Sequence, residues 1–508
     1  MQQNEEKNCR VQEMFLQKTQ PFEVTSEFVL PDYRSEISRL LWVRPVFSAP
    51  VRFQGGGKAD LSGAVRYEVL YTGPDGKCYG VELEDGYAFS VPMELPAGFE
   101  NTAGILISAE ICPDTVVSRV TAPRKLSVRC RMHADVRAFG EKNLAPRVEG
   151  AEAENAENLC RAIDCGRYFG SGAETLELTG ELTPDIAGDI RVISAHGEVF
   201  LPDAVAMGGA VRCRGEAEIT VLCTDDSDGA TPIALTLGMP IEAEIPFDGV
   251  LPDCHARATG TVTRLTTAVE DGRITVNAGV SLSSEAQGSE PAVVWRDLFV
   301  PGYQAECRFA EETLFTAAGC ANRNFSVNEE AVKKDLGMPE DAEILDAFCG
   351  AELRERNADG NKGTVLNGEL CCHMLYAANG EYGVAELRAP LRTTWEERTD
   401  DMIYNVSVPK CRVRTESGRV LLHAEAAVSA RGTGEVHTQV LSGVQLTEKE
   451  AAEQRDPELF YPAPGETLFG VGKRYGISPA RLAEQNGISA DDPGSPESLS
   501  GVRFLLIG

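Results

Sequence analysis

One block of sequence occurs three times in this 508-residue chain, and this repeat limits the possible folds more than any other feature. Each copy is a glycine followed by an alternating apolar and polar run: Gly63 begins GAVRYEVLYT, Gly215 begins GEAEITVLCT and Gly368 begins GELCCHMLYA. The three glycines lie 152 and 153 residues apart. A period this regular predicts three copies of one structural unit.

Each copy has the pattern of antiparallel β-strands. A proline followed by an acidic residue precedes the glycine by 32, 31 and 29 residues, at Pro31-Asp32, Pro184-Asp185 and Pro339-Glu340. A turn-forming stretch (GPDGK, DDSDG or AANGE) follows the strand that begins at each glycine. Each copy then closes on an alternating run that begins at Lys125, Arg273 or Arg419. A period of two buries one face of each strand and leaves the other in water. We therefore predict a mainly β chain with three antiparallel β-sandwich-like units.

The segments between the copies differ from them in composition. We place the β-repeats at 21–137, 172–286 and 322–432, after an N-terminal helix or tail over 1–20. The acidic, alanine-rich segment 138–171 is typical of a short surface helix or a flexible linker. The connector 287–321 is more apolar, so it fits either a connector or part of a neighbouring unit. The charged linker 433–457 should let a terminal module, residues 458–508, move independently.

Residues 460–507 have the pattern of a small strand–helix–helix–strand fold. Thr467 is placed to cap a helix, and apolar residues recur at helical spacing until Gly476 ends it. Ser478, followed by proline at the first helical position, caps a second helix that ends at Asn486-Gly487. An apolar run over residues 504–507 predicts the closing strand.

This pattern resembles the LysM module, on the strings GETL, KRYGIS and Asn486-Gly487-Ile488 and on the terminal apolar strand. The resemblance implies a small α+β (βααβ) fold with a groove between two loops that holds N-acetylglucosamine-containing glycans. The groove residues that it assigns here are Gly465, Glu466, Thr467, Leu468, Asn486, Gly487 and Ile488. The chain departs from the family at Gly472 and in a longer second loop, SADDPGSPES. On physical grounds alone, Thr467 and Asn486 are equally well explained as helix caps.

The charge balance and the apolar pattern exclude several classes of partner. With 78 acidic and 48 basic side chains, the chain has a formal charge of −30, which repels nucleic acid and anionic lipid. The start, MQQNEEKNCRVQEMF, lacks the apolar core of a secretory signal, and no apolar run is long enough to span a bilayer. We therefore expect a cytoplasmic protein with no nucleic-acid partner and no membrane insertion.

The 15 cysteines are scattered and form no CxxC pair, as expected of thiols in a reducing compartment. Cys371-Cys372-His373 and Asp253-Cys254-His255 are the candidates for a metal site or a nucleophile. In a strand, Cys371 and His373 would share one face and Cys372 the other, which leaves too few ligands for a closed zinc site. We predict no metal and no cofactor.

The sequence contains no recognisable catalytic constellation. The six histidines share no motif, and GxSxG, HExxH, a P-loop and a strand-borne GxGxxG are absent. Acidic pairs such as Glu84-Asp85 lie near predicted turns, where a solvated surface explains them. Repeated sheets with exposed edges favour the binding of partners. We therefore predict that the chain is not an enzyme.

Three such repeats followed by a LysM module resemble the SPOCS-domain proteins of endospore-forming bacteria, which are associated with sporulation and the spore coat. The resemblance rests on the proline–acid start, the glycine strand and the closing strand of each repeat. It implies a morphogenetic scaffold, made in the mother cell, that tethers the assembling coat to the forespore surface through the coat-basement ATPase. In that setting the LysM module binds protein in place of sugar.

Two other functions remain open at this point. A wall-associated protein would use the LysM module to bind peptidoglycan, whereas a glycan hydrolase would use it as a substrate anchor and would need catalytic residues that are not apparent. The sequence is compatible with three β-units that pack together and with three units that hang as separate beads.

Overall fold

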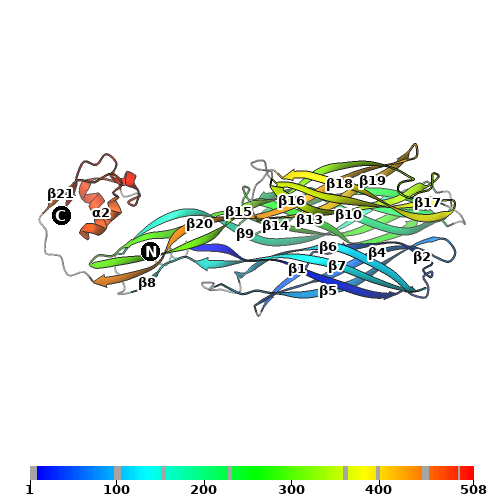
Figure 1. The fold of residues 1–508 in the computed structure, drawn as a ribbon, viewed down its shortest axis with the longest axis horizontal. Coiled ribbons are helices and arrows are strands. Elements are labelled where there is room, and N and C mark those ends of the chain that lie inside the picture. Colours follow the sequence, from blue (N-terminus) through cyan, green and yellow to red (C-terminus); the bar gives the residue numbers. More distant parts are fainter. Residues whose placement is uncertain are drawn as a thin grey trace.

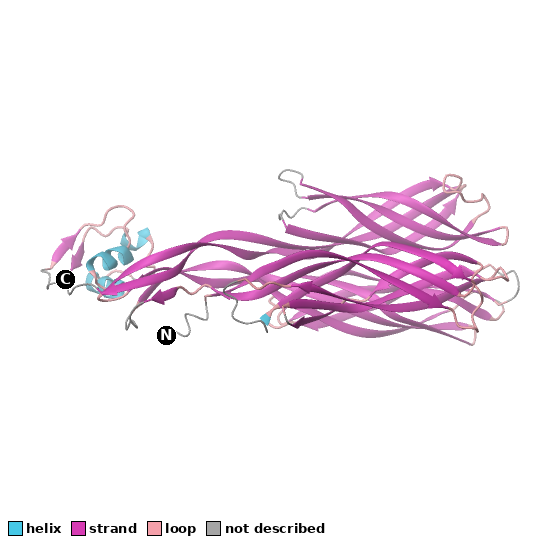
Figure 2. Cartoon of the chain, turned by 60° about the horizontal axis from the view of Figure 1, so that its bottom comes forward, coloured by secondary structure: helices cyan, strands magenta, loops and turns pink. Residues whose placement is uncertain are grey.

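The structure is a computed structural model that describes residues 9–508, apart from 56, 97–103, 150–155, 187, 227–230, 359–363, 396–400, 449–456 and 490–491. The molecule is elongated, with the C-terminal helices at one end and most of the strands at the other (Figures 1 and 2). The predicted fold class, a mainly β chain with a small α+β module, is confirmed.

Each repeat contributes two antiparallel sheets. Repeat 1 contains β1 (Arg10–Val29), β2 (Arg39–Phe47), β3 (Val51–Gly55), β4 (Lys58–Thr72), β5 (Cys78–Pro92), β6 (Leu106–Ala122) and β7 (Lys125–Asn143). Repeat 2 contains β9 (Glu157–Leu182), β10 (Ile190–Met207), β11 (Ala210–Asp225), β12 (Ile233–Pro246), β13 (His255–Glu270) and β14 (Arg273–Phe299). Repeat 3 contains β15 (Tyr303–Val332), β16 (Glu343–Ala358), β17 (Thr364–Ala378), β18 (Glu381–Trp395), β19 (Asp401–Glu416) and β20 (Arg419–Glu448).

The strand order is the same in all three repeats. The first strand pairs with the last and the last pairs with the one before it, in the orders β1-β7-β6, β9-β14-β13 and β15-β20-β19. The middle strands form the facing sheet as β10-β11-β12 and β16-β17-β18, and in repeat 1 β4 pairs with β2 and β3 on one edge and with β5 on the other. Apolar side chains from both sheets fill the space between them. The predicted units are therefore β-sandwiches.

The glycine that marks each repeat lies where the chain approaches a neighbour too closely for a side chain. A Cβ on Gly215 would lie 1.9 Å from the carbonyl oxygen of Phe200, and one on Gly368 would lie 2.2 Å from that of Glu352. In both repeats the strand register shifts at this point. In repeat 1, a Cβ on Gly63 would instead lie 2.4 Å from a tyrosine hydroxyl. The glycines are therefore required by close packing, at β-bulges in repeats 2 and 3.

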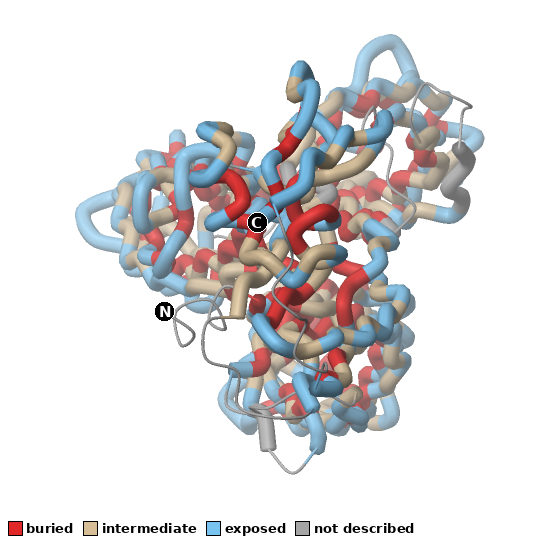
Figure 3. The backbone as a smooth tube through the Cα atoms, turned by 90° about the vertical axis from the view of Figure 1, so that its left-hand side faces the viewer, coloured by how far each residue is buried: buried red, intermediate tan, exposed pale blue. Residues whose placement is uncertain are grey.

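The three sandwiches surround a common axis, and they appear as lobes when the molecule is viewed along its length (Figure 3). At one end of this axis, one buried cluster contains the equivalent leucine of each repeat block, Leu70, Leu222 and Leu375. The cluster also contains the extra residue of an equivalent bulge in each repeat, Leu41, Ile193 and Leu345. Since every repeat supplies the same positions, the units pack together and are not separate beads.

Side-chain contacts join every pair of repeats near this cluster. They are the Arg44–Glu198 ion pair, the His196 Nε2–Asp346 Oδ2 contact of 3.0 Å, and the Trp42–Phe348 ring pair with centroids 5.2 Å apart. Burial alone would lower the pKa of His196, but the adjacent Asp346 carboxylate raises it above its ordinary value of 6.5. The imidazolium form of His196 is therefore favoured at this contact.

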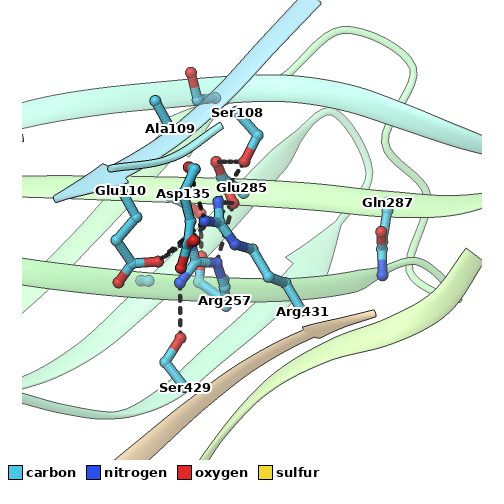
Figure 4. A network of polar contacts seen from close by, with 12 residues as sticks. Ser108, Ala109, Glu110, Asp135, Arg257, Glu285, Gln287, Ser429 and Arg431 are labelled. Atoms are coloured by element: carbon cyan, nitrogen blue, oxygen red, sulfur yellow. Dashed lines mark hydrogen bonds and ion pairs between the residues drawn. The ribbon is translucent and has the colours of Figure 1, made fainter. Parts of the chain in front are cut away.

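A buried network of charges lies further along the axis (Figure 4). Equivalent positions, each 12 residues after the start of the closing strand, carry Arg137, Glu285 and Arg431. Glu285 accepts hydrogen bonds from Arg257 Nη2 at 2.8 Å, from Ser108 Oγ at 2.7 Å and from the Tyr168 hydroxyl at 3.1 Å. Its carboxylate lies 3.7 Å from Arg431 Nη1.

The charges in this network hold one another in the ionised state. Burial would raise the pKa of Glu285, but the guanidinium groups of Arg257 and Arg431 hold it well below its ordinary value. Arg257 also contacts Glu110, with Nη2 and Oε2 2.9 Å apart, and the same two guanidinium groups lower the pKa of Glu110 against the effect of burial. The three repeats are thus joined by matched charges as well as by apolar side chains.

In the segments predicted as linkers, 138–171, 287–321 and 433–457, the described residues are largely in strands, while 150–155 and 449–456 lie outside the described part. Strands β9, β14, β15 and β20 continue beyond the lobes and pair as β9–β14 and β15–β20. We call the part formed by residues 157–168, 287–299, 303–317 and 433–448 the stalk. At 3.3 Å per residue, these segments are about 40–50 Å long. A short strand, β8 (Arg147–Glu149), pairs in parallel with β20. The predicted helix or tail over 1–20 is also wrong from Arg10 onward, because β1 begins there.

The stalk folds because the repeats come together. Its core draws side chains from all three repeats: Val11, Leu144, Cys165, Ala292, Val294, Leu314 and Val440. The segments 138–171 and 433–457 alone have too few apolar residues in alternation to predict a buried strand, and pairing between distant segments overrides the local preference. The more apolar composition of 287–321 was the correct signal for part of a neighbouring unit, because this connector is divided between β14 and β15.

The C-terminal module contains β21 (Glu458–Phe460), α2 (Leu468–Tyr475), α3 (Pro479–Asn486), a 3-10 turn (Pro496–Leu499) and β22 (Leu505–Ile507). In the part of the chain that the structure describes, no helix has the length and apolarity needed to cross a membrane.

Candidate functional site

The two helices of the module begin and end at the predicted residues. Thr467 Oγ1 accepts a hydrogen bond from the Gly470 amide at 3.0 Å, and α2 ends at Gly476, which has a φ of 72°. Ser478 Oγ accepts one from the Arg481 amide at 3.2 Å, and α3 ends at Gly487 with a φ of 62°. The caps predicted from residue type are therefore the actual caps.

The module has an apolar core of its own. Strands β21 and β22 pair antiparallel, with Leu459 opposite Leu506. Beneath them the helices bury Leu468, Val471, Leu482 and Ala483, with Leu499, Leu505 and Ile507 completing the cluster. The predicted strand–helix–helix–strand order is confirmed, with the closing strand starting at Leu505, while Phe504 is half exposed.

Among the predicted groove residues of the first loop, one is buried. Leu468 is fully buried in the core, so its side chain cannot reach a ligand. Gly465 is exposed in a turn with a φ of 88°. Glu466 accepts a hydrogen bond from the Ala463 amide at 2.8 Å and pairs with Arg474, with Oε1 and Nη2 2.6 Å apart. Thr467 is half buried beside it. The first loop therefore offers a turn and two polar side chains.

In the second predicted groove segment, Asn486 has a structural role. Its amide nitrogen donates to the carbonyl oxygens of Leu482 at 2.9 Å and Leu506 at 3.1 Å, and its Oδ1 accepts from the Leu506 amide at 2.6 Å. Asn486 thus ties α3 to β22 and has little bonding capacity left for a ligand. Gly487 is exposed beside it, and Ile488 is half buried against the core.

The longer second loop folds back over the start of α2. The Phe469 amide donates to the Pro493 carbonyl oxygen at 2.8 Å, and the Leu468 amide donates to Ser498 Oγ at 3.1 Å. The first loop therefore contacts residues 493–498 directly, a contact that the sequence did not predict. Serine and proline in SADDPGSPES were the only local signal, because they are common in turns that bond to nearby backbone.

The outer face of the two-stranded sheet is apolar and exposed. Leu459, Tyr461, Phe504 and Leu506 are 52%, 67%, 51% and 46% exposed. The Tyr461 and Phe504 rings lie 6.4 Å apart between centroids. Strand alternation places these side chains opposite the module core. The two aromatic rings are candidate contact residues that the sequence analysis did not single out.

The module docks on the tip of the stalk through the turn between its helices. Lys473 pairs with Asp297, and Ser478 Oγ donates to Glu157, which also accepts from the Ala480 amide at 3.3 Å. These contacts differ from the predicted independent module. Residues 473–480 lie at the end of the helix pair opposite to Thr467 and Gly487. The second loop also touches the stalk, because Gly494 lies against the side chain of Leu159.

The cysteine–histidine motif is arranged as strand alternation predicts. Cys371 and His373 share one face of β17, with Sγ and Nε2 3.6 Å apart, and Cys372 lies on the other face. Two further thiols, Cys349 and Cys411, come from other strands and lie beside Cys372, so the spacing of residues 371–373 did not indicate them. Only the register of the strands brings these residues together. The described cysteines form no disulfide.

Comparison with known protein families matches residues 463–493 to the LysM domain. Comparisons with curated proteins and with solved structures give no match. The C-terminal module is therefore a LysM domain, as predicted. The assignment of the three repeats to SPOCS-domain proteins stays a prediction.

Proposed function

We propose that this chain is a non-catalytic, glycan-binding adaptor whose LysM domain binds N-acetylglucosamine-containing glycan such as peptidoglycan. The observation that carries the proposal is the way the LysM domain is mounted. Its polar contacts with the stalk come from Lys473, Ser478 and Ala480, at the end of the helix pair opposite to the predicted groove residues. A domain mounted in this way leaves Gly465 and Gly487 exposed to an extended polymer.

The groove residues divide into contacts and supports. Gly465 and Gly487 are exposed, and their backbones leave room for a sugar ring to approach. Thr467 and Glu466 supply polar atoms on the first loop, and Ile488 supplies an apolar contact on the second. Leu468 and Asn486 hold the two loops in place from below. A neutral sugar is bound by a few such polar groups beside an apolar surface.

The absence of a recognised catalytic motif supports an adaptor without enzymatic activity. The three sandwiches supply broad surfaces, and their role in the proposal is to attach the glycan-binding end to a protein partner. The first candidate for that setting is endospore coat assembly, in the mother-cell cytoplasm at the forespore surface, with the coat-basement ATPase as the partner. This part of the proposal rests on the resemblance of the repeats to SPOCS-domain proteins.

A matched pair of helix-cap variants tests the glycan proposal in the full-length chain. Thr467→Ala and Ser478→Ala remove the same kind of hydrogen bond and each costs the domain about 1 kcal/mol. Thr467 lies at the groove end and Ser478 at the docked end. We expect Thr467→Ala to weaken binding to N-acetylglucosamine oligomers and to insoluble peptidoglycan, and Ser478→Ala to leave both unchanged.

Truncation to residues 1–457 should abolish glycan binding altogether. If the full chain does not bind either glycan, or if Ser478→Ala weakens binding as much as Thr467→Ala, the proposed site is wrong. Tyr461→Ala separates the groove from the outer sheet face, because loss of binding in this variant alone would place the sugar on the aromatic pair.

The coat proposal is tested by localisation. A fluorescent fusion of the full chain should accumulate at the forespore surface of sporulating cells, and a pull-down from the same cells should recover the coat-basement ATPase. Uniform cytoplasmic fluorescence with no recovered ATPase would contradict this setting and leave the glycan-binding proposal to stand on its own test.

A further inference from the structure

Three cysteines meet inside the sandwich of repeat 3. Cys349 on β16 and Cys372 on β17 are directly opposite one another in the strand register. Cys411 comes from β19 in the facing sheet. The Cys349 and Cys411 sulfurs are 3.0 Å apart, and the Cys372 and Cys411 sulfurs are 3.7 Å apart. All three sulfur atoms lie within 4.8 Å of one another.

The other two repeats show that the fold does not require thiols at these positions. By the same strand registers, repeat 1 has Pro45, Tyr67 and Val116 there, and repeat 2 has Gly197, Ile219 and Leu265. Proline, tyrosine, aliphatic side chains and glycine fill this place in the sister sandwiches, and none of them is a thiol. A single buried cysteine is explained as a small apolar residue. Here three cysteines from three different strands meet, and they do so in repeat 3 alone. That arrangement needs a further explanation.

We propose that Cys349, Cys372 and Cys411 form a three-thiolate site for a soft metal ion, with Cu(I) as the ion that fits it. Thiolate sulfur is the ligand that selects Cu(I) and zinc over harder ions. With metal–sulfur bonds of about 2.3 Å, three sulfurs around one ion lie about 4 Å apart. The Cys372–Cys411 separation of 3.7 Å is close to that geometry, and the Cys349–Cys411 separation of 3.0 Å would have to open by about 1 Å to reach it.

The coordination number favours Cu(I) over zinc. The group contains three sulfur ligands. Among the described residues, no histidine, further cysteine or carboxylate belongs to it as a fourth ligand. A structural zinc site needs four ligands. His196 lines a cavity beside the sulfurs, but its Nε2 bonds Asp346 at 3.0 Å. Three sulfurs complete a trigonal Cu(I) site without it.

Access to the three sulfurs also suits a metal. A cavity of about 30 Å³ lies between repeats 2 and 3, and Cys349 and Cys411 form part of its wall. That volume has room for an ion to enter. On binding, three S–H bonds are replaced by three Cu–S bonds, three protons leave to solvent, and no electron is transferred.

The site is tested on the full, reduced chain by competition for Cu(I) with the chelating dye bathocuproine disulfonate under anaerobic conditions. All proteins carry Cys371→Ala, which removes the thiol of the neighbouring Cys371, His373 and Glu386 group on the opposite face. We expect this parent protein to hold one tight equivalent of Cu(I). X-ray absorption should show three sulfur neighbours around the copper.

Cys372→Ala and Cys411→Ala should each lower the affinity for Cu(I). The loss should exceed the roughly 10- to 100-fold that follows when a group hydrogen-bonded to a metal ligand is removed. Cys130→Ala is the matched control, because Cys130 is a buried thiol in the core of repeat 1, outside the three-cysteine group. Circular dichroism of the metal-free proteins identifies any variant that has not folded. Cys411→Ala is the safer of the two, since Cys411 is only partly buried.

Three results would overturn the proposal. The first is a parent protein that takes no Cu(I) from the dye. The second is binding that survives both Cys372→Ala and Cys411→Ala in folded protein. The third is a preference for Zn(II) over Cu(I) in direct competition.

Discussion

Replacing Glu285 by glutamine should destabilise all three packed β-sandwiches, because Glu285 balances buried positive charge between the repeats. The side chains of Glu285, Arg257 and Arg431 are 7%, 6% and 4% exposed. Glutamine preserves the shape but removes the negative charge, so that the two guanidinium groups lose their closest shared carboxylate. Removal of one member of a buried ion pair costs about 3–5 kcal/mol. We expect Glu285→Gln to lower the free energy of unfolding by that amount.

An exposed ion pair in the same repeat provides the control. Glu177 Oε2 lies 2.8 Å from Arg264 Nη2, with side chains 61% and 66% exposed, and such pairs contribute about 0–1 kcal/mol. Urea unfolding of Glu285→Gln and Glu177→Gln should be followed by the fluorescence of the three tryptophans, which lie one in each repeat. If the repeats unfold as one unit, the combined tryptophan signal of Glu285→Gln shows a single transition, shifted to a lower urea concentration.

The free energy of unfolding at acidic pH gives a second measurement on the Glu285 carboxylate. Burial would raise the pKa of Glu285, but Arg257 and Arg431 lower it below the ordinary 4.5. The stability from this group is therefore present above about pH 4.5 and is lost as the pH falls through the lower folded-state pKa. Glu285→Gln should lose part of this acid dependence. A cost below about 1 kcal/mol, or an equal cost for Glu177→Gln, would refute the assigned role of the network.

Three further predictions concern other contacts. Gly215→Ala should lower the free energy of unfolding by about 2–3 kcal/mol, because its Cβ would meet a carbonyl oxygen at 1.9 Å. Gly208→Ala is the control: a Cβ there would have nothing within 4 Å, so thermal melts should show no change for this variant. The raised pKa of His196 adds stability that is fully present below about pH 6.5 and is lost as the pH rises through the folded-state pKa. Asp346→Asn should therefore flatten the stability profile above pH 6.5, and an unchanged profile would exclude this pair as its cause. Glu157→Ala should release the LysM domain from the stalk and broaden the distance distribution in small-angle X-ray scattering, whereas an identical distribution would show that other contacts hold the domain.

The local features of the fold were predictable because they depend on residues close in sequence. The glycine strands, the turns GPDGK and AANGE and the caps at Thr467 and Ser478 each follow from a short pattern, and the structure confirms them. The predicted turn DDSDG lies partly outside the described residues. The stalk was not predictable in this way. Segments such as 138–171 have an acidic composition typical of linkers, and they become strands only through pairing with partners far away in the chain.

The same distinction applies to the candidate sites. The LysM loops could be assigned from their own residues, but the role of Asn486 as a tie to β22 depends on the closing strand. The meeting of Arg137, Glu285 and Arg431 depends on how three repeats pack around one axis. The thiol group depends on Cys349 and Cys411, which no spacing rule connects with Cys372. Contacts between distant strands are set by register, which a single sequence does not reveal.

The stalk also determines how the molecule would respond to pulling. The LysM domain is held at one end and the lobes lie at the other (Figure 1). Tension between these ends would run parallel to β9, β14, β15 and β20, so the ladder of hydrogen bonds would be loaded in shear, many bonds at a time, and not peeled apart one by one. The few polar contacts of Glu157 and Asp297 would yield first. A stretched molecule would therefore lengthen at this joint while its strands remained paired.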